Sequence, residues 1–287
     1  MSSSSRKEAE KGLLCSLLMG FSFGLMGYLV NICHLPPPDL VFLRSGISCF
    51  ILTPLIYTHL RELFLPHATT LLLRSLAGAA AMLCFFSNLQ QAGVGIATSF
   101  ANFAPIIVTL IAALFFKVKL KRAELIGITI AVAGALSLYK VSTTTASVAA
   151  VGLFGALCTA VAQLALRQAA LSFSPALVVW SMSLVTMITS MLVGGRPSNE
   201  WWTSSTTLWA ALGVALTGLL GQVFMTLAYT KLSAPVASTF GLSSLVWGVL
   251  FETAFSKNPP SFAECLSYLA IILGVCTIHL SQKNRSF

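Results

Sequence analysis

A repeat at a fixed offset of 140 residues constrains this chain more than any other feature of its sequence. Residues of the first half recur in the second half, and no gap is needed between the matches. Solenoid repeats have units of about 20–50 residues, so this period is too long for them. It is typical of membrane proteins built from two copies of one unit. The clearest matches are Gly12 with Gly152, Gly78 with Gly218, Ala97-Thr98-Ser99-Phe100 with Ala237-Ser238-Thr239-Phe240, Phe115 with Phe255, Glu124 with Glu264, and Gly134 with Gly274.

The composition places both copies in a membrane. Hydrophobic residues make up 56% of the chain and charged residues only 9%, whereas a soluble domain carries about 25% charged residues. A bilayer core of about 30 Å needs about 20 apolar helical residues, and the sequence offers ten segments of that kind. They are residues 12–32, 39–58, 70–91, 94–116, 122–139, 148–171, 175–193, 206–229, 234–255 and 262–281.

These segments predict an all-α membrane protein with ten transmembrane helices. Five belong to a first repeat, residues 12–140, and five to a second repeat, residues 148–281. We expect residues 1–11 to form a disordered tail and residues 282–287 a short C-terminal tail. The first apolar run is too long for a signal-peptide core, so we expect it to be retained as a helix.

The distribution of Lys and Arg predicts the orientation, because cytoplasmic loops carry an excess of both. With the N-terminus inside, thirteen basic residues fall on the cytoplasmic side and three on the other side, so we expect both termini in the cytoplasm. Five helices per repeat then make the second repeat inverted relative to the first. The inside set is Arg6, Lys7, Lys11, Arg61, Arg74, Lys117, Lys119, Lys121, Arg122, Arg167, Lys231, Lys283 and Arg285, and the outside set is Lys140, Arg196 and Lys257.

The net charge of +9 does not indicate nucleic-acid binding, because the basic residues lie in short loops between apolar runs. None of the seven cysteines forms a CxxC pair, so we expect neither a metal site nor a cofactor. The apolar runs also lack the residue clusters of known catalytic motifs. We therefore expect that the chain is not an enzyme and has no catalytic residues.

Four stretches resemble the EamA type of the drug/metabolite transporter superfamily. They are Pro38–Arg44, the aromatic, small-residue and proline run from Phe85 to Pro105, Gly127–Gly134, and the acidic helix end Leu250–Glu252. The resemblance implies a ten-helix transporter in which helices from both halves surround a central cavity. It also implies a multi-pass protein of the cell membrane, of the bacterial inner-membrane type.

Polar residues in the apolar segments are the candidates for substrate contact. In segment 94–116, Thr98, Asn102, Pro105 and Thr109 share one helical face. Such a stripe either lines a cavity or holds helices together. Trp247 is either a stacking platform for a substrate or a packing residue. The full candidate set for substrate binding is Arg44, Asn88, Thr98, Asn102, Gln163, Gln222, Tyr229 and Trp247.

Arg44 and Glu252 are the candidates for a gate or for ion coupling, since charges inside membrane segments are costly and commonly functional. Arg44 either contacts an anionic substrate group or bonds to backbone carbonyls. Glu252 is either a coupling carboxylate or a cap at the interface. Both are expected at the same depth in the outer leaflet, so a salt bridge between them is a further hypothesis.

We expect a secondary active transporter that moves a small polar or zwitterionic metabolite by alternating access. An amino acid or its derivative fits the predicted lining, and a solute like S-adenosylmethionine is a second candidate. The alternatives are a membrane-embedded enzyme and a lipid-handling membrane protein that transports nothing. The expected partners are the metabolite and the lipid bilayer, without nucleic acid. Segments 122–139 and 262–281 are apolar on nearly all sides, which suits either the lipid-facing periphery or a homodimer contact.

Overall fold

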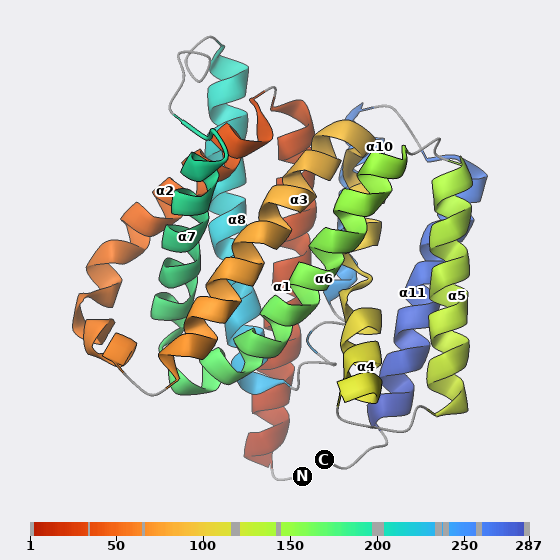
Figure 1. Cartoon of the computed structure of the whole chain (residues 1–287), viewed down its shortest axis with the longest axis horizontal. Helices are drawn as coiled ribbons and strands as arrows, with labels where there is room; N and C mark the ends of the chain where they lie inside the picture. The colour runs from red at the N-terminus through yellow and green to blue at the C-terminus, as the bar shows by residue number, and fades with distance from the viewer. Residues whose placement is uncertain are drawn as a thin grey trace.

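The computed structural model describes residues 3–33, 35–64, 67–115, 121–141, 145–196, 204–232, 237, 241–256 and 260–283. These residues form a bundle of helices (Figure 1). The helices are α1 (Ser3–Ile32), α2 (Pro37–Ile56), η1 (Tyr57–Phe64), α3 (Ala68–Ala101), α4 (Ala104–Phe115), α5 (Arg122–Val141), α6 (Ala146–Ser172), α7 (Pro175–Leu192), α8 (Ser205–Lys231), α10 (Ser243–Ser256) and α11 (Phe262–Lys283).

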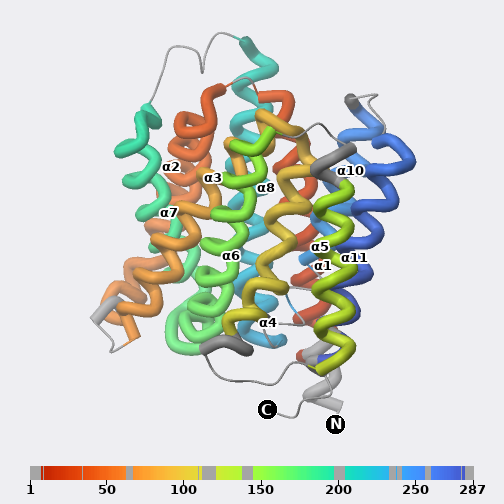
Figure 2. Tube along the Cα trace, turned by 45° about the vertical axis from the view of Figure 1, so that its right-hand side comes forward, coloured from red at the N-terminus to blue at the C-terminus, as the bar shows by residue number. Residues whose placement is uncertain are grey.

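Six helical stretches of the described residues are long and apolar enough to cross a membrane. Two shorter apolar helical stretches are Ser243–Phe255 and Phe262–Ile278. The start of α1 and the end of α11 lie at the same end of the bundle (Figures 1 and 2). One expectation needs correction, because Ser3–Lys11 belongs to α1 and does not form a disordered tail.

Helix starts in the two halves use matching local chemistry. Prolines stand in the first turns of α2 and α7, where the missing N–H costs nothing. The backbone N–H of Lys121 donates to the carboxylate of Glu124 at 2.8 Å, and that of Ser261 donates to Glu264 at 2.7 Å. Each carboxylate reaches back over the first turn of its helix, as in a capping box. The 140-residue offset therefore relates the starts of α5 and α11 in structure as well as in sequence.

The packing of the helices follows the same offset. Helix α3 packs against α6, and the corresponding helices α8 and α1 pack against each other. Likewise α4 contacts α6, while α10 contacts α1. Helices α2 and α7, which correspond to each other, are neighbours, and so are α5 and α11. These contacts support an inverted duplication, whose domain limits stay a prediction.

Helices α5 and α11 run side by side in opposite directions at one edge of the bundle (Figures 1 and 2). A Cβ at Gly127 would lie 2.6 Å from the carbonyl oxygen of Gly274, and a Cβ at Gly134 would lie 2.9 Å from that of Ser267. The two helices thus meet backbone to backbone. Their apolar faces cover each other, and a homodimer through them stays a prediction.

Segment 94–116 is not the single continuous helix that we expected. Gly93 adopts φ 80° and ψ 174°, a conformation that favours glycine and breaks α3 internally. A second break follows at Asn102 and Phe103, before α4 begins at Ala104. Pro105 therefore lies in the first turn of α4 and does not kink a helix interior. The second half has a break at the corresponding place, because a turn at Leu242 precedes α10.

Candidate functional site

A cavity of about 180 Å³ lies between the two halves of the chain. Side chains of α1, α2, α3, α4, α6, α7, α8 and α10 line it. One water needs only about 10–15 Å³ of such a space, so the cavity has room for a small solute. Six of the predicted residues line this cavity, namely Arg44, Thr98, Asn102, Gln163, Gln222 and Tyr229.

Arg44 projects from α2 and is only 2% exposed. Its Nη2 donates to the carbonyl oxygen of Gly218 on α8 at 3.1 Å, and its Nη1 donates to the sulfur of Met82 at 2.7 Å. Any Cβ at Gly218 would overlap the guanidinium group. The glycine therefore makes the space that this buried cation occupies.

Arg74 is a second buried arginine in the cavity, 3% exposed, and the sequence analysis missed it. Its Nη2 donates to the Oε1 of Gln222 at 3.1 Å. A Cβ at Gly78, one turn further along α3, would overlap its Nη1. We had assigned Arg74 to a cytoplasmic loop, although it falls within the apolar segment 70–91. The sequence did contain a signal for this residue. Arg74 is a charge inside an apolar segment, and it stands four residues before Gly78, which recurs as Gly218.

The cavity carries positive charge. Arg44 and Arg74 lie close enough to repel each other. Neither of them has a carboxylate within ion-pair distance among the described residues, and the cavity lining includes no Asp or Glu. Buried charges normally need partners. This arrangement favours an anionic group in the cavity.

The break between α3 and α4 contributes Thr98 and Asn102. The hydroxyl of Thr98 donates to the carbonyl oxygen of Val94 at 2.6 Å, so it is satisfied within its own helix. The backbone N–H of Asn102 donates to Thr98 O at 3.0 Å and ends the helical segment. The side-chain Nδ2 of Asn102 has no protein acceptor, which leaves a donor at the cavity. The side chain of Thr109 lies outside the described residues.

Gln163 and Tyr229 complete the predicted residues of the lining. Tyr229 is 1% exposed, and its hydroxyl has no hydrogen-bond partner in the protein. The carbonyl oxygen of Tyr229 accepts from Arg167 of α6, which ties α6 to α8. Arg167 is thus a packing residue as well as a basic residue near a membrane surface. Five methionines and three phenylalanines form most of the apolar wall: Met19, Met26, Met82, Met182, Met225, Phe23, Phe85 and Phe86.

Asn88 does not line the cavity, contrary to the prediction. Its Nδ2 donates to the carbonyl oxygen of Val148 at 3.1 Å, and it lies against Gly152 of α6. The side chain is 1% exposed. Asn88 therefore links α3 to α6. This is the second role expected of a polar residue in an apolar segment, which is to hold two helices together.

Trp247 also lies outside the cavity lining. It packs edge to face on Phe21, with ring centroids 5.2 Å apart, and stacks near Phe251 at 6.1 Å. This aromatic group joins α1 to α10 on the outer surface of the bundle. Packing, and not stacking on a substrate, is the role that these contacts support.

The hypothesis of an Arg44–Glu252 salt bridge is wrong. Glu252 accepts from the Nδ2 of Asn31 at 3.4 Å. Its carboxylate lies beside Gly93, where a built Cβ would be 3.1 Å from its Oε1. It therefore faces the start of the helical segment that follows Gly93, where the helix dipole stabilises an acid. Arg44 is bonded elsewhere, so the equal depth predicted for the two residues did not make them neighbours.

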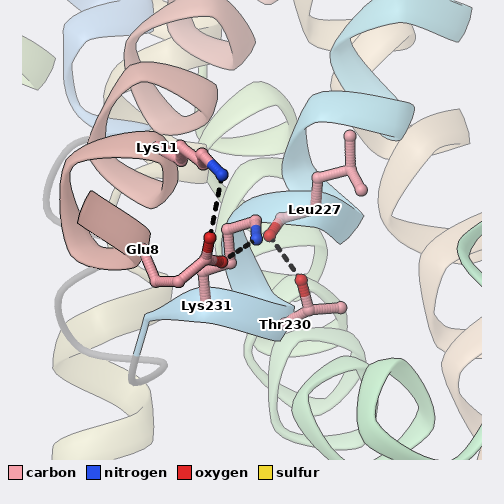
Figure 3. Close-up of polar contacts among 5 residues, drawn as sticks. All are labelled: Glu8, Lys11, Leu227, Thr230 and Lys231. Carbon is pink, nitrogen blue, oxygen red and sulfur yellow. Dashed lines mark hydrogen bonds and ion pairs between the residues drawn. The ribbon is translucent and has the colours of Figure 1, made fainter. Parts of the chain in front are cut away.

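Charged side chains link the start of α1 to the end of α8 (Figure 3). Glu8 bonds to Lys11 at 2.9 Å and to Lys231 at the end of α8, while Thr230 bonds to the carbonyl oxygen of Leu227. The hydrogen bonds from Lys231 and Lys11 lower the pKa of Glu8 from 4.5 to about 2. Glu8 therefore joins the first helix of one half to a helix of the other half.

Comparison with known proteins places this site in a family of transporters. The sequence model of the EamA-like transporter family matches residues 10–140. The pseudopaline exporter CntI of Pseudomonas aeruginosa is 31% identical, over 96% of this chain and 98% of the exporter. An uncharacterized transporter of Helicobacter pylori is 28% identical, over 93% of this chain and 92% of that protein. A crystal structure with 18% sequence identity superposes with a TM-score of 0.64, covering 93% of this chain and 97% of the other, and shares the fold.

Proposed function

Because the chain belongs to the EamA-like transporter family, we propose that it is a secondary active transporter of a small metabolite that carries a carboxylate. The observation that carries this proposal is the cavity between the halves, with two buried arginines and no acidic residue in its lining. Charge-assisted hydrogen bonds from guanidinium to carboxylate are among the strongest available in proteins. The free donors of Asn102 and Tyr229 add polar contacts beside them.

The cavity supports one of the two expected substrate classes better than the other. The carboxylate of an amino acid or derivative finds two cationic partners. S-adenosylmethionine has the same carboxylate, but it adds a sulfonium cation to the ammonium group that both classes carry, and the lining offers no carboxylate to either cation. We therefore retain the amino-acid-like class and set the second aside.

Alternating access is the mechanism that we propose, with outward transport as its direction. Direction rests on the relative that is a pseudopaline exporter. Helices of both halves line the cavity, and both halves contain a helix broken beside it, at Asn102 and at Leu242. Broken helices at a repeat interface are typical of transporters that rock one half against the other.

We propose that the protein lies in a cell membrane of the bacterial inner-membrane type. Both of its termini then face the cytoplasm. The start of α1, which carries Lys11, the start of α5 at Arg122, the end of α8 at Lys231 and the end of α11 at Lys283 all lie at one end of the bundle (Figure 1). An excess of basic residues marks the cytoplasmic side. A reporter that is active only in the cytoplasm should work when fused after Phe287 and fail when inserted between Gly194 and Asn199. The reverse result would refute this orientation.

A proteoliposome assay tests the proposed function. Purified full-length protein is reconstituted, and counterflow of radiolabelled amino acids and other small carboxylates is followed beside a chemical analysis of both compartments. We expect solute exchange without a new product. Formation of a product would favour the membrane enzyme, and neither exchange nor product across the panel would favour the lipid-handling alternative.

A further inference from the structure

The cavity holds two arginines where one would suffice for a single carboxylate. Arg44 comes from α2 and Arg74 from α3, and both are almost fully buried. They repel each other and have no acidic partner in the described part of the chain. Two buried charges of one sign at one cavity are costly, so the solute that completes the site has to compensate for both.

Each guanidinium group is held in a fixed place. Arg44 is bonded to Gly218 and Met82, and Arg74 is bonded to Gln222. A guanidinium group has five N–H donors. The bonds described use two donors of Arg44 and one of Arg74, which leaves three and four donors. Both Nε atoms are buried without a partner.

Matching glycines make room for the two groups. Gly78 leaves space for Arg74, and Gly218, its equivalent in the second half, leaves space for Arg44. A Cβ at either position would overlap the guanidinium group. Each half of the chain thus contributes one glycine that makes room for one guanidinium group. Two separate cation positions suit two separate anionic groups.

Resting on the proposed function, we propose that the transported solute is an organic dianion with two carboxylates, one for each guanidinium group. Two carboxylates balance the charge of Arg44 and Arg74, whereas one leaves a net positive charge buried. The methionine and phenylalanine wall suits a carbon frame between the carboxylates, and methionine adapts readily to irregular shapes.

The test measures binding to full-length protein in detergent by the ligand-dependent shift of its thermal unfolding midpoint. The probes are the dicarboxylates from malonate to adipate, the monocarboxylates of the same chain lengths, glutamate, and inorganic phosphate. At least one dicarboxylate should bind at least about tenfold more tightly than its matched monocarboxylate, since a charged hydrogen bond contributes substantially. Equal binding of both series, no dicarboxylate binding, or tighter binding of phosphate would overturn the proposal.

Variants assign the two carboxylates to the two arginines. Arg44→Gln and Arg74→Gln should each remove most of the preference for the dicarboxylate and change monocarboxylate binding less, while Arg74→Lys should restore part of it. If either Gln variant does not fold, Gly218→Ala and Gly78→Ala displace the same groups without removing charge. Gly46→Ala is the control, because its Cβ would meet only Met187 at an ordinary 3.6 Å. A preference that survives all the variants would contradict the assignment.

Counterflow in proteoliposomes separates this inference from the proposed function. Exchange of monocarboxylates or of neutral amino acids without any advantage of a dicarboxylate would overturn the inference and leave the transporter function standing. Absence of exchange for every solute of the panel would instead remove the proposed function. Preferential exchange of a dicarboxylate supports both.

Discussion

Two of the regions that join the halves of this chain depend on glycine, each in a different way. Between α5 and α11, Gly127 and Gly274 let one backbone touch the other, and a Cβ at Gly274 would lie 2.5 Å from the carbonyl oxygen of Gly127. At the cavity, Gly78 and Gly218 leave space for the guanidinium groups of Arg74 and Arg44. The first region has apolar packing around its glycines, and the second holds buried charge.

The comparison separates a contact that holds the fold from a contact that forms the site. Backbone atoms in a helix pair cannot move away from an added methyl group without shifting a whole helix, so substitution there should cost stability. A guanidinium group at the end of a side chain can move, so substitution at the cavity should cost binding. Each region thus predicts a different loss for the same Gly→Ala change.

The largest effect is expected from Gly218→Ala. The new methyl group displaces the guanidinium group of Arg44 from its bond to the carbonyl oxygen of residue 218. We expect carboxylate binding to weaken by about 1.5–3 kcal/mol, the range for a hydrogen bond to a charged group. A titration followed by the shift in thermal midpoint measures this. If a folded Gly218→Ala protein bound the carboxylate with wild-type affinity, the glycine at the cavity would not be needed for binding.

The next effect is expected from Gly274→Ala. Its Cβ would lie 2.5 Å from the carbonyl oxygen of Gly127 and 2.6 Å from the backbone nitrogen of Ala131. Overpacking of this kind costs about 1–3 kcal/mol of unfolding free energy. The thermal midpoint in detergent should fall, with Gly46→Ala unchanged or higher because alanine favours a helix. An unchanged midpoint would show that the helix pair yields more easily than its geometry indicates.

A smaller effect is expected from Asn102→Leu. The side chain loses the free Nδ2 donor at the cavity, so substrate binding should weaken by about 0.5–1.5 kcal/mol while the protein still folds. Gln222→Leu should weaken binding more, because it also removes the acceptor of Arg74. Michaelis constants from proteoliposome counterflow measure both. Unaltered constants in both variants would exclude these side chains from the site.

The smallest effect is expected from pH acting on Glu8. The pKa of Glu8 is lowered from 4.5 to about 2, so its contact with Lys11 and Lys231 contributes fully above about pH 4.5. That contribution is lost as the pH falls toward 2. The difference in midpoint between wild type and Glu8→Gln should therefore shrink over this window and also in high salt. A difference independent of pH would show that the ion pairs contribute nothing.

The sequence predicted the helical class, the family and six residues that line the cavity, because these depend on local properties. Apolar length predicts a membrane helix, and the offset between Gly78 and Gly218 marks equivalent places in two copies. A sequence also gives the phase of residues around one helix, which is why Thr98 and Asn102 were placed together. The boundary between segments 70–91 and 94–116 likewise coincides with a real break, at Gly93.

The errors concern how one helix is rotated and positioned against another. Arg44 and Glu252 have similar predicted depths, but depth does not specify which neighbour a helix face meets. Asn88 has a polar side chain within an apolar run, yet that face meets α6 instead of the cavity. Arg74 was missed because it was counted as a loop residue. A count of basic residues takes every Lys or Arg near the end of a segment as evidence for the topology.

Flux measured for Gly218→Ala and Gly274→Ala in proteoliposomes with equal amounts of folded protein tests the central claim most directly. If the arginine-lined cavity is the transport site and the α5–α11 contact is structural, Gly274→Ala should exchange solute at a rate per folded molecule close to wild type. Gly218→Ala should exchange it at least about tenfold more slowly at solute concentrations below the wild-type Michaelis constant, in line with the loss of a charged hydrogen bond. Wild-type flux in Gly218→Ala together with lost flux in folded Gly274→Ala would contradict the account.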